Sequence, residues 1–210
     1  MVREELINEG GLANNGLLTR ILEDLEACGF IRKFNYQGIK HMTAIYQLID
    51  NYTLFYYKFL HNRAGVDESF WSINTNTPVR NAWEGLAFER VCFEHIRQIK
   101  QALGIAGVST QIYSWRVKDD PVYGDGAQID MVIDRADQIV NLCEMKFSTT
   151  EYIIDKSDDE SLRHKANRFR ETQKGHKAVY AIMITPFGIK PNMYQYSVQN
   201  VVTAKDLFRE

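Results

Sequence analysis

Two apolar strands separated by a short turn constrain this chain more than any other feature. Residues 126–148 read GAQIDMVIDRADQIVNLCEMKFS, and the polar stretch 135–138 divides the apolar runs. This pattern predicts an antiparallel β-hairpin. Asp130, Glu144 and Lys146 fall within the strands, at positions that would otherwise be core. Burying such groups is costly unless they are paired or bind a metal, so the hairpin predicts a polar site within a sheet.

The facing of these residues follows from strand geometry. Side chains alternate between the two faces of a strand with a period of two, so one face is shared by Gln128, Asp130, Val132 and Asp134. If the turn pairs Asp134 with Val140, Asp130 lies opposite Glu144. Directly opposed residues have Cβ atoms about 5 Å apart, so two carboxylates are expected side by side.

The same register places Gln128 opposite Lys146, which adds an ammonium beside the two acids. Adjacent carboxylates repel, so one of them protonates unless a cation joins the pair. Hard oxygen ligands suit Mg²⁺. The alternative is a solvated hairpin face on which Lys146 forms an ion pair with Asp130 or Glu144. A slip of one residue in the register would scatter the group onto two faces.

Size and composition limit the function classes. The chain has 210 residues and a net charge of -2, which allows one or two domains with their own cores. No apolar run is long enough to span a membrane, and no secretory signal is visible. Cys28, Cys92 and Cys143 match no zinc spacing, and they favour a reducing, cytoplasmic setting. Because the charge is near neutral, nucleic-acid binding would need local basic patches.

Residues 1–61 are expected to form a winged-helix-like domain with an aromatic linker helix. The expected elements are helices over 3–8 and 16–28, strands over 30–34 and 44–48, and the aromatic helix over 50–61. Four residues are candidate DNA contacts: Arg20, Arg32, Lys33 and Lys40. The alternative is an intramolecular docking module, because the second helix has few positive charges. The aromatic helix is expected to pack as core or domain interface, and residues 62–78 form a linker.

Residues 79–210 are expected to form a mixed sheet flanked by helices. The expected elements are one long helix over 79–103, a strand over 110–116, the hairpin, a helix over 158–174, a strand over 177–185 buried on both sides, a strand over 198–202 and a short helix from 203. The connection from the hairpin to the strand at 177–185 fits a parallel crossover. Glu89 falls on the apolar stripe of the first helix, where a glutamate is exceptional.

The order helix-Glu, strand-Asp, strand-Glu-x-Lys, basic helix resembles the PD-(D/E)XK nuclease superfamily. The residues that carry the likeness are Glu89 in GLAFE, Asp130 in QID, and Glu144 and Lys146 in EMK. The resemblance implies a restriction-endonuclease-like fold in which Asp130 and Glu144 hold Mg²⁺ or Mn²⁺ and Glu89 is an accessory ligand. It also implies that Lys146 activates or orients the attacking water. Weaker candidates for substrate contacts are Gln128, Arg163 and Lys165.

Most of the chain also resembles the C-terminal part of certain prokaryotic AAA-type ATPases, which carry a winged helix and a PD-(D/E)XK-like domain. The segments that carry this likeness are 16–31, 44–50 and the hairpin. The chain departs from that family in lacking a GxxxxGK[ST] motif, so no ATP binding is expected. The first helix of the winged helix also looks missing or shortened. The partners implied are DNA and an ATPase domain or another protein, and no membrane.

Two functions remain open at this point. One is a metal-dependent DNA endonuclease with a winged-helix DNA-binding or docking domain. The other is a non-catalytic DNA-binding or regulatory protein-interaction module. A serine or cysteine hydrolase is disfavoured because no histidine has a recognisable nucleophile partner, and we interpret all of these as surface or structural residues: His41, His61, His95, His164 and His176. Cys143 alternates away from Glu144 and is expected to be packed.

Overall fold

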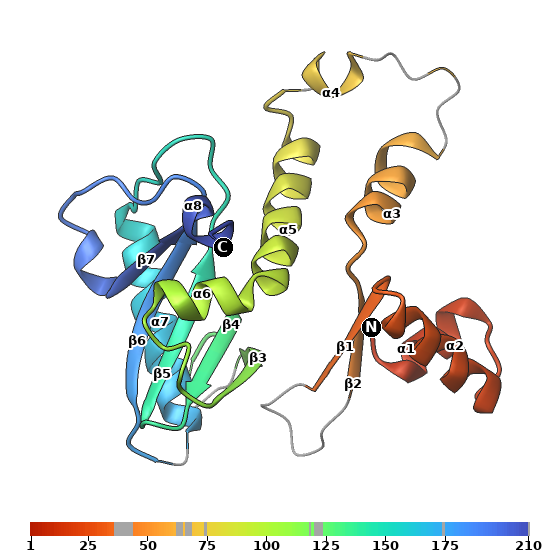
Figure 1. Cartoon of the computed structure of the whole chain (residues 1–210), viewed down its shortest axis with the longest axis horizontal. Coiled ribbons are helices and arrows are strands. Elements are labelled where there is room, and N and C mark those ends of the chain that lie inside the picture. The colour runs from red at the N-terminus through yellow and green to blue at the C-terminus, as the bar shows by residue number, and fades with distance from the viewer. Residues whose placement is uncertain are drawn as a thin grey trace. The chain divides into compact units, whose positions relative to one another are not determined.

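The protein is a mixed α/β chain that divides into two compact units. A computed structural model describes residues 1–35, 44–61, 65, 69–73, 75–117, 119, 124–173 and 175–209. The first unit spans Met1–Trp83 and the second Glu84–Glu210 (Figure 1). The division falls inside helix α5 (Pro78–Glu94), within the first turns of the helix that was expected to open the second domain.

The first unit begins with two helices and a hairpin, in the order that the sequence predicts. These elements are α1 (Arg3–Gly10), α2 (Gly16–Ala27), β1 (Ile31–Asn35) and β2 (Ala44–Leu48). The side chain of Asn15 caps α2 by accepting a hydrogen bond of 3.1 Å from the backbone N–H of Leu18. Gly29 follows α2 with φ +76°, a conformation that favours glycine. The strands are antiparallel, with Ile31 paired to Leu48.

The aromatic segment of the first unit forms a cluster. It comprises α3 (Asn51–Phe55), a π-helical turn η1 (Tyr56–Leu60) and α4 (Phe70–Ile73). Phe55, Phe59, Trp71 and Trp83 pack edge to face or tilted, with ring centroids 5.0–6.1 Å apart. The expected core role is therefore confirmed for Phe55 and Phe59. Tyr52, in contrast, is 73% exposed.

The second unit is built on a five-stranded mixed sheet of order β3-β4-β5-β6-β7. Its strands are β3 (Thr110–Val117), β4 (Ala127–Arg135), β5 (Ile139–Met145), β6 (Ala178–Thr185) and β7 (Asn200–Thr203). The first three are antiparallel, and β5, β6 and β7 run parallel. Helix α7 (Lys156–Thr172) connects β5 to β6, as the predicted crossover requires. The 3₁₀ turn η2 (Gln195–Ser197) and helix α8 (Ala204–Leu207) flank β7.

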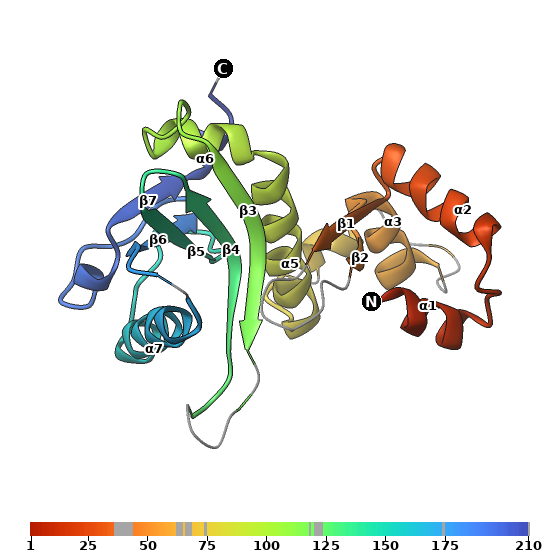
Figure 2. The same cartoon turned by 90° about the horizontal axis from the view of Figure 1, so that it is seen from below.

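Helices cover both faces of this sheet. Figure 2 shows α7 on one side and α5 with α6 (Ile96–Ala102) on the other. On the α5–α6 side, Cys92 and Ile99 pack against Met131 and Cys143. On the α7 side, the buried residues include Trp115, Ile129, Val132, Leu142, Ala166 and Phe169. The expected packing of Cys143, away from Glu144, is thus confirmed.

Two sequence predictions need correction. The helix expected over 79–103 is broken at His95, whose φ of -108° and ψ of 27° lie outside the helical region. The His95 Nδ1 atom lies 2.8 Å from the Val91 carbonyl, a local side-chain contact that competes with regular helix. In addition, β6 is buried on both faces only in its second half, because Tyr180 is 39% exposed.

No helix among the described residues is both long enough and apolar enough to cross a membrane.

Candidate active site

A β-bulge positions Asp130. The predicted hairpin register is confirmed, because Asp134 pairs with Val140. On the other edge of β4, however, the register shifts, so that Asp130 and Met131 lie opposite the single residue Ser114. The Ser114 hydroxyl donates a 2.8 Å hydrogen bond to the Asp130 carbonyl oxygen at this point. The extra residue changes which way the start of β4 faces.

The bulge separates Val132 from Gln128 and Asp130, so the prediction that Val132 shares their face is wrong. Ile129 and Val132 pack in the same core beneath α7, which strict alternation forbids, and Gln128 is exposed. The pairing of β4 with β5 ends at Met131 and Cys143, so the expected opposition of Gln128 and Lys146 in the ladder is also wrong.

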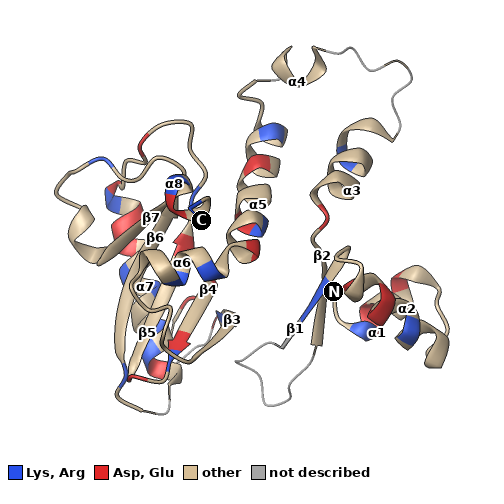
Figure 3. Ribbon diagram, in the orientation of Figure 1, with Lys and Arg blue, Asp and Glu red and all other residues tan. Residues whose placement is uncertain are grey.

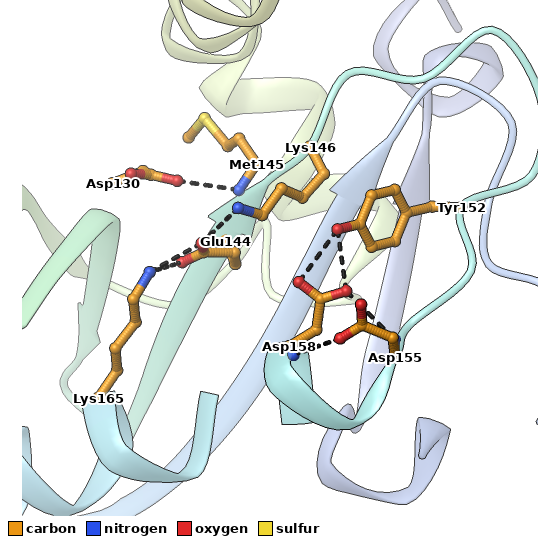
Figure 4. A network of polar contacts seen from close by, with 8 residues as sticks. All are labelled: Asp130, Glu144, Met145, Lys146, Tyr152, Asp155, Asp158 and Lys165. Carbon is orange, nitrogen blue, oxygen red and sulfur yellow. Dashed lines mark hydrogen bonds and ion pairs between the residues drawn. The ribbon is translucent and has the colours of Figure 1, made fainter. Parts of the chain in front are cut away.

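Beyond the last backbone pair of β4 and β5, the Asp130 carboxylate takes the place of a backbone acceptor for β5. Its Oδ2 atom accepts a 3.0 Å hydrogen bond from the backbone N–H of Met145. The side chain thereby reaches across to β5 beside Glu144, although Asp130 is not a ladder partner of that residue. Figure 4 shows this hydrogen bond to the Met145 amide, with Glu144 close by. The bulge and this hydrogen bond bring together the two acids that the register alone was expected to join.

Glu144 is a buried carboxylate held between two ammonium groups. Its oxygens accept hydrogen bonds of 2.8 and 2.6 Å from Lys165 Nζ on α7. Lys146 Nζ lies 3.3 Å from Oε1 of the same carboxylate (Figure 4). Glu144 is only 7% exposed, so these cations compensate a charge that water does not reach well.

These side chains line one cavity of about 350 Å³ in the second unit. Its lining residues are Glu89, Gly126, Ala127, Gln128, Asp130, Glu144, Met145, Lys146, Ser161, His164 and Lys165. Six residues predicted for the site therefore converge, including Glu89 from α5. Arg163 does not join them. It lies at a second cavity of about 330 Å³ on another flank of α7, and its Nε forms a 2.9 Å ion pair with Asp159.

The carboxylates perturb one another. Burial, together with repulsion from Asp130 and Glu144, raises the pKa of Glu89 to about 7. Burial and the Glu144 charge raise the pKa of Asp130 to about 6, although the hydrogen bond from Met145 opposes this shift. Desolvation and like charge are the two causes that keep a carboxyl protonated, and both act here. The cavity therefore favours the binding of a cation or the protonation of its carboxylates.

Lys146 keeps its charge. Burial alone would lower its pKa, but the adjacent Glu144 carboxylate and its hydrogen bond raise it overall. A lysine that holds its proton more tightly is a poor general base. Of the two roles implied for this residue, charge stabilisation and orientation of water fit better than proton abstraction.

The donor set suits a hard divalent cation. Asp130, Glu144 and Glu89 offer carboxylate oxygens, the ligands that Mg²⁺ and Mn²⁺ prefer. Across the described ranges, no three Asp, Glu, His or Cys side chains are grouped closely enough to chelate an ion as they stand. In this arrangement Lys165 and Lys146 provide the positive charge beside Glu144. The three acids are the residues that would hold the metal.

Two residues that line this cavity were not predicted as site residues. His164 and Ser161 on α7 both line it. The Nε2 atom of His164 is buried and has no hydrogen-bond partner in the described part of the chain. The spacing of Ser161, His164 and Lys165 at i, i+3 and i+4 was the available signal, since it places all three on one helix face.

The predicted DNA contacts belong to the first unit. Arg20 and Lys33 are exposed, Arg32 is half-buried, and Lys40 lies outside the described residues. Glu23, Asp24 and Glu26 lie on α2 with Arg20 (Figure 3). The helix is therefore acidic overall.

No protein-family model, curated protein or solved structure matches this sequence.

Proposed function

We propose that the second unit is a metal-dependent phosphodiesterase domain of the PD-(D/E)XK nuclease type. The observation that carries the proposal is the convergence of Glu89, Asp130, Glu144, Lys146 and Lys165 on one cavity. Three acids and two lysines in a confined space match the needs of phosphodiester hydrolysis, which are neutralisation of the phosphate and activation of water.

The residues divide into two roles. Asp130, Glu144 and Glu89 are the metal ligands, and their mutual repulsion provides the driving force for taking up a cation. A bound Mg²⁺ or Mn²⁺ supplies Lewis acidity and a water of lowered pKa. Lys146 holds a positive charge beside Glu144, where it orients water or meets a phosphate oxygen.

Lys165 links the two roles. Its ammonium contacts both oxygens of the Glu144 carboxylate and holds that carboxylate in place. Because a lysine is a flexible point charge, it is able to turn from the acid to a bound phosphate. We assign it to substrate contact, together with the exposed Gln128 at the rim.

DNA is the substrate that the proposal names. It follows from the resemblance to the C-terminal region of prokaryotic AAA-type ATPases, in which a winged helix accompanies the nuclease-like domain. The first unit would then serve as the DNA-binding or docking part, with Arg20, Arg32 and Lys33 among its described basic residues. An ATPase domain or another protein is the expected partner.

The test is cleavage of supercoiled plasmid by the whole chain with Mg²⁺ or Mn²⁺. The wild type should nick the plasmid, and Asp130→Ala should abolish nicking. Asp137→Ala is a matched control, because Asp137 lies in the turn of the same hairpin and pairs with Arg135 rather than facing the cavity. Equal activity of wild type and Asp130→Ala would refute the proposal.

The alternative is a regulatory protein-interaction module without catalysis, and the surface of α2 favours it. Leu17 and Ile21 are 63% and 45% exposed, beside the acidic residues Glu23 and Asp24. Such a face suits a protein better than the DNA major groove, where a recognition helix meets phosphates.

A fluorescent DNA duplex separates the two readings. If the first unit binds DNA, its affinity should fall with salt, and Arg20→Ala should reduce the salt slope by about 1. Absence of binding by the whole chain even at low salt would favour the protein-interaction module.

A further inference from the structure

A second cavity of the same unit lies beside the start of β6. Its volume of about 330 Å³ falls within the range of about 300–1,000 Å³ that is usual for ligand pockets. β7 pairs with β6 only from Ile182 onward, and the described residues provide no strand beside Val179 and Ala181 on that side. Gln199 contacts Ala181 through both its backbone and its side chain. The cavity therefore opens between α7, the start of β6 and the turn η2 that precedes β7.

Helix α7 separates this cavity from the one that contains the acids. Lys165 lines the acidic cavity, whereas Arg163, Asn167 and Arg170 line the second one. The spacing of these three residues at i, i+4 and i+7 places them along one side of the helix. The two cavities therefore lie on different flanks of α7, and the second one is separate from the proposed metal ligands.

The second cavity carries positive charge. Of the described residues that line it, two are arginines and none is acidic. The Nε atom of Arg163 pairs with Asp159 at 2.9 Å, so part of this charge is compensated from outside the lining. Arg170 donates a 2.9 Å hydrogen bond from Nη1 to the neutral side-chain oxygen of Asn167. An arginine side chain has five N–H donors, and each of these contacts uses one of them. The cavity therefore favours an anion.

Tyr196 adds an aromatic wall. This residue belongs to η2 and is 77% exposed, although it lines the cavity. The aliphatic side chains of Leu162 and Val179 add apolar surface. An accessible aromatic ring beside cations is the arrangement that binds single-stranded nucleic acid, because a base stacks on the ring while the backbone meets the positive charges. An acidic peptide would use the arginines but would have no base to stack on the ring.

We propose that this second cavity binds one nucleotide of a single DNA strand. The base stacks on the Tyr196 ring, and the phosphates on either side of it contact Arg163 and Arg170. The site recognises unpaired DNA outside the cleavage cavity, since a base within a duplex is already stacked on its neighbours. This inference rests on the proposed function only in taking DNA as the strand.

Binding of a fluorescein-labelled oligothymidine to the whole chain, measured by fluorescence anisotropy in EDTA, tests the site without cleavage. Tyr196→Ala should weaken binding by about 5-fold or more, the usual loss for one stacked base. Tyr196→Phe should bind as wild type does, because it keeps the ring. Arg163→Gln and Arg170→Gln should each reduce the slope of log K against log salt by about 0.7.

A matched control is Arg97→Gln. Arg97 is an exposed arginine of α6, the helix on the opposite face of the sheet, so its loss should leave both affinity and salt slope unchanged (Figure 2). Asp130→Ala should also bind the oligonucleotide as wild type does, because Asp130 lines the other cavity. Circular dichroism should show every variant folded, since Tyr196 and Arg163 are exposed.

The outcomes separate this site from the nuclease. If the wild type does not bind the oligothymidine at low salt, or if Tyr196→Ala and both arginine variants bind as tightly as wild type, the site is refuted whatever the result of plasmid cleavage. If Tyr196→Ala loses affinity and Tyr196→Phe keeps it while plasmid remains uncut, the strand site is supported and the nuclease is not. Displacement of the oligothymidine by oligoglutamate of equal charge, as effective as by unlabelled oligothymidine, would overturn the assignment to a nucleotide.

Discussion

The ammonium of Lys165 on α7 lies 2.8 and 2.6 Å from the two carboxylate oxygens of Glu144 on β5. This ion pair joins the crossover helix to the sheet at the cavity where the other acids gather. It also means that a buried negative charge depends on a residue 21 positions away in the sequence. The pair is therefore both a structural link and part of the site.

We expect Lys165→Met to destabilise the protein strongly. The change leaves a buried carboxylate with Lys146 as its remaining described partner, and breaking such a pair costs on the order of 3 kcal/mol. The double variant Lys165→Met with Glu144→Gln should recover a large part of this loss, because the unpaired charge is gone. Urea unfolding measures each value. Lys156→Met, which removes an exposed ion pair with Glu160, is the control and should change stability by less than about 1 kcal/mol. Equal stability of Lys165→Met and the double variant would contradict this view.

Glu89 should make folding stability fall as pH rises. Its ordinary pKa is 4.5, and burial with repulsion from Asp130 and Glu144 raises it to about 7 in the folded protein. The folded state thus holds the proton more tightly, so the contribution is full below about pH 4.5 and is lost as pH rises through 7. Because the carboxyl is partly exposed, solvent screening reduces the effect to roughly 1–2 kcal/mol.

The measurement is the free energy of unfolding of wild type and Glu89→Gln in EDTA between pH 4 and pH 8. The stability of wild type relative to Glu89→Gln should decrease across this range. A constant difference would show that Glu89 has an ordinary pKa.

A divalent cation should stabilise the folded chain through the acids. A ligand that binds only the folded state at about 100 times its Kd adds roughly 2.7 kcal/mol, which corresponds to several degrees in Tm. Mg²⁺ or Mn²⁺ should therefore raise the Tm of wild type, and Asp130→Asn should abolish most of the rise. Asp137→Asn, in the turn of the hairpin, should behave as wild type. Differential scanning fluorimetry with and without EDTA decides this, and an undiminished rise in Asp130→Asn would exclude the carboxylates as the metal site.

Two glycines of the second unit should respond oppositely to alanine. A Cβ on Gly126 would lie 2.7 Å from the Val117 carbonyl oxygen and 3.0 Å from Asp119 Oδ1. Gly126→Ala must shift the start of β4, so it should cost about 1–3 kcal/mol and also disturb the cavity that Gly126 lines. A Cβ on Gly85 in α5 meets no atom within 4 Å, so Gly85→Ala should stabilise by about 0.5–1 kcal/mol. Thermal unfolding measures the sign of the stability change in both variants. An unchanged stability of Gly126→Ala would be inconsistent with the close approach of Gly126 to the Val117 carbonyl oxygen.

The hairpin shows how far local pattern predicts structure. Alternation and the position of the turn predicted the pairing of Asp134 with Val140, because both depend on neighbouring residues. The bulge at Asp130 and Met131 was not predictable in this way. It depends on how β3 pairs with β4, and the register shift there is a contact between separate segments.

The chemical residue types at the site were visible in the sequence, and their convergence was not. Asp130, Glu144, Lys146 and the stripe residue Glu89 stood out because charged groups at apolar positions are costly. His164 did not stand out, because an isolated histidine on a helix usually needs no special explanation. Its position at the cavity depends on the packing of α7 against the sheet, which periodicity does not predict.

The sequence by itself determined the order of the elements, the hairpin register and most of the charged residues of the site. These depend on side-chain periodicity and on neighbours close along the chain. Tertiary structure decided three other features: the bulge that aims Asp130 at the Met145 amide, the break at His95, and the contact of Lys165 on α7 with Glu144. The first and third features arise from contacts between segments far apart in the chain, and the second arises from competition between local hydrogen bonds. Side-chain periodicity predicts neither kind of interaction.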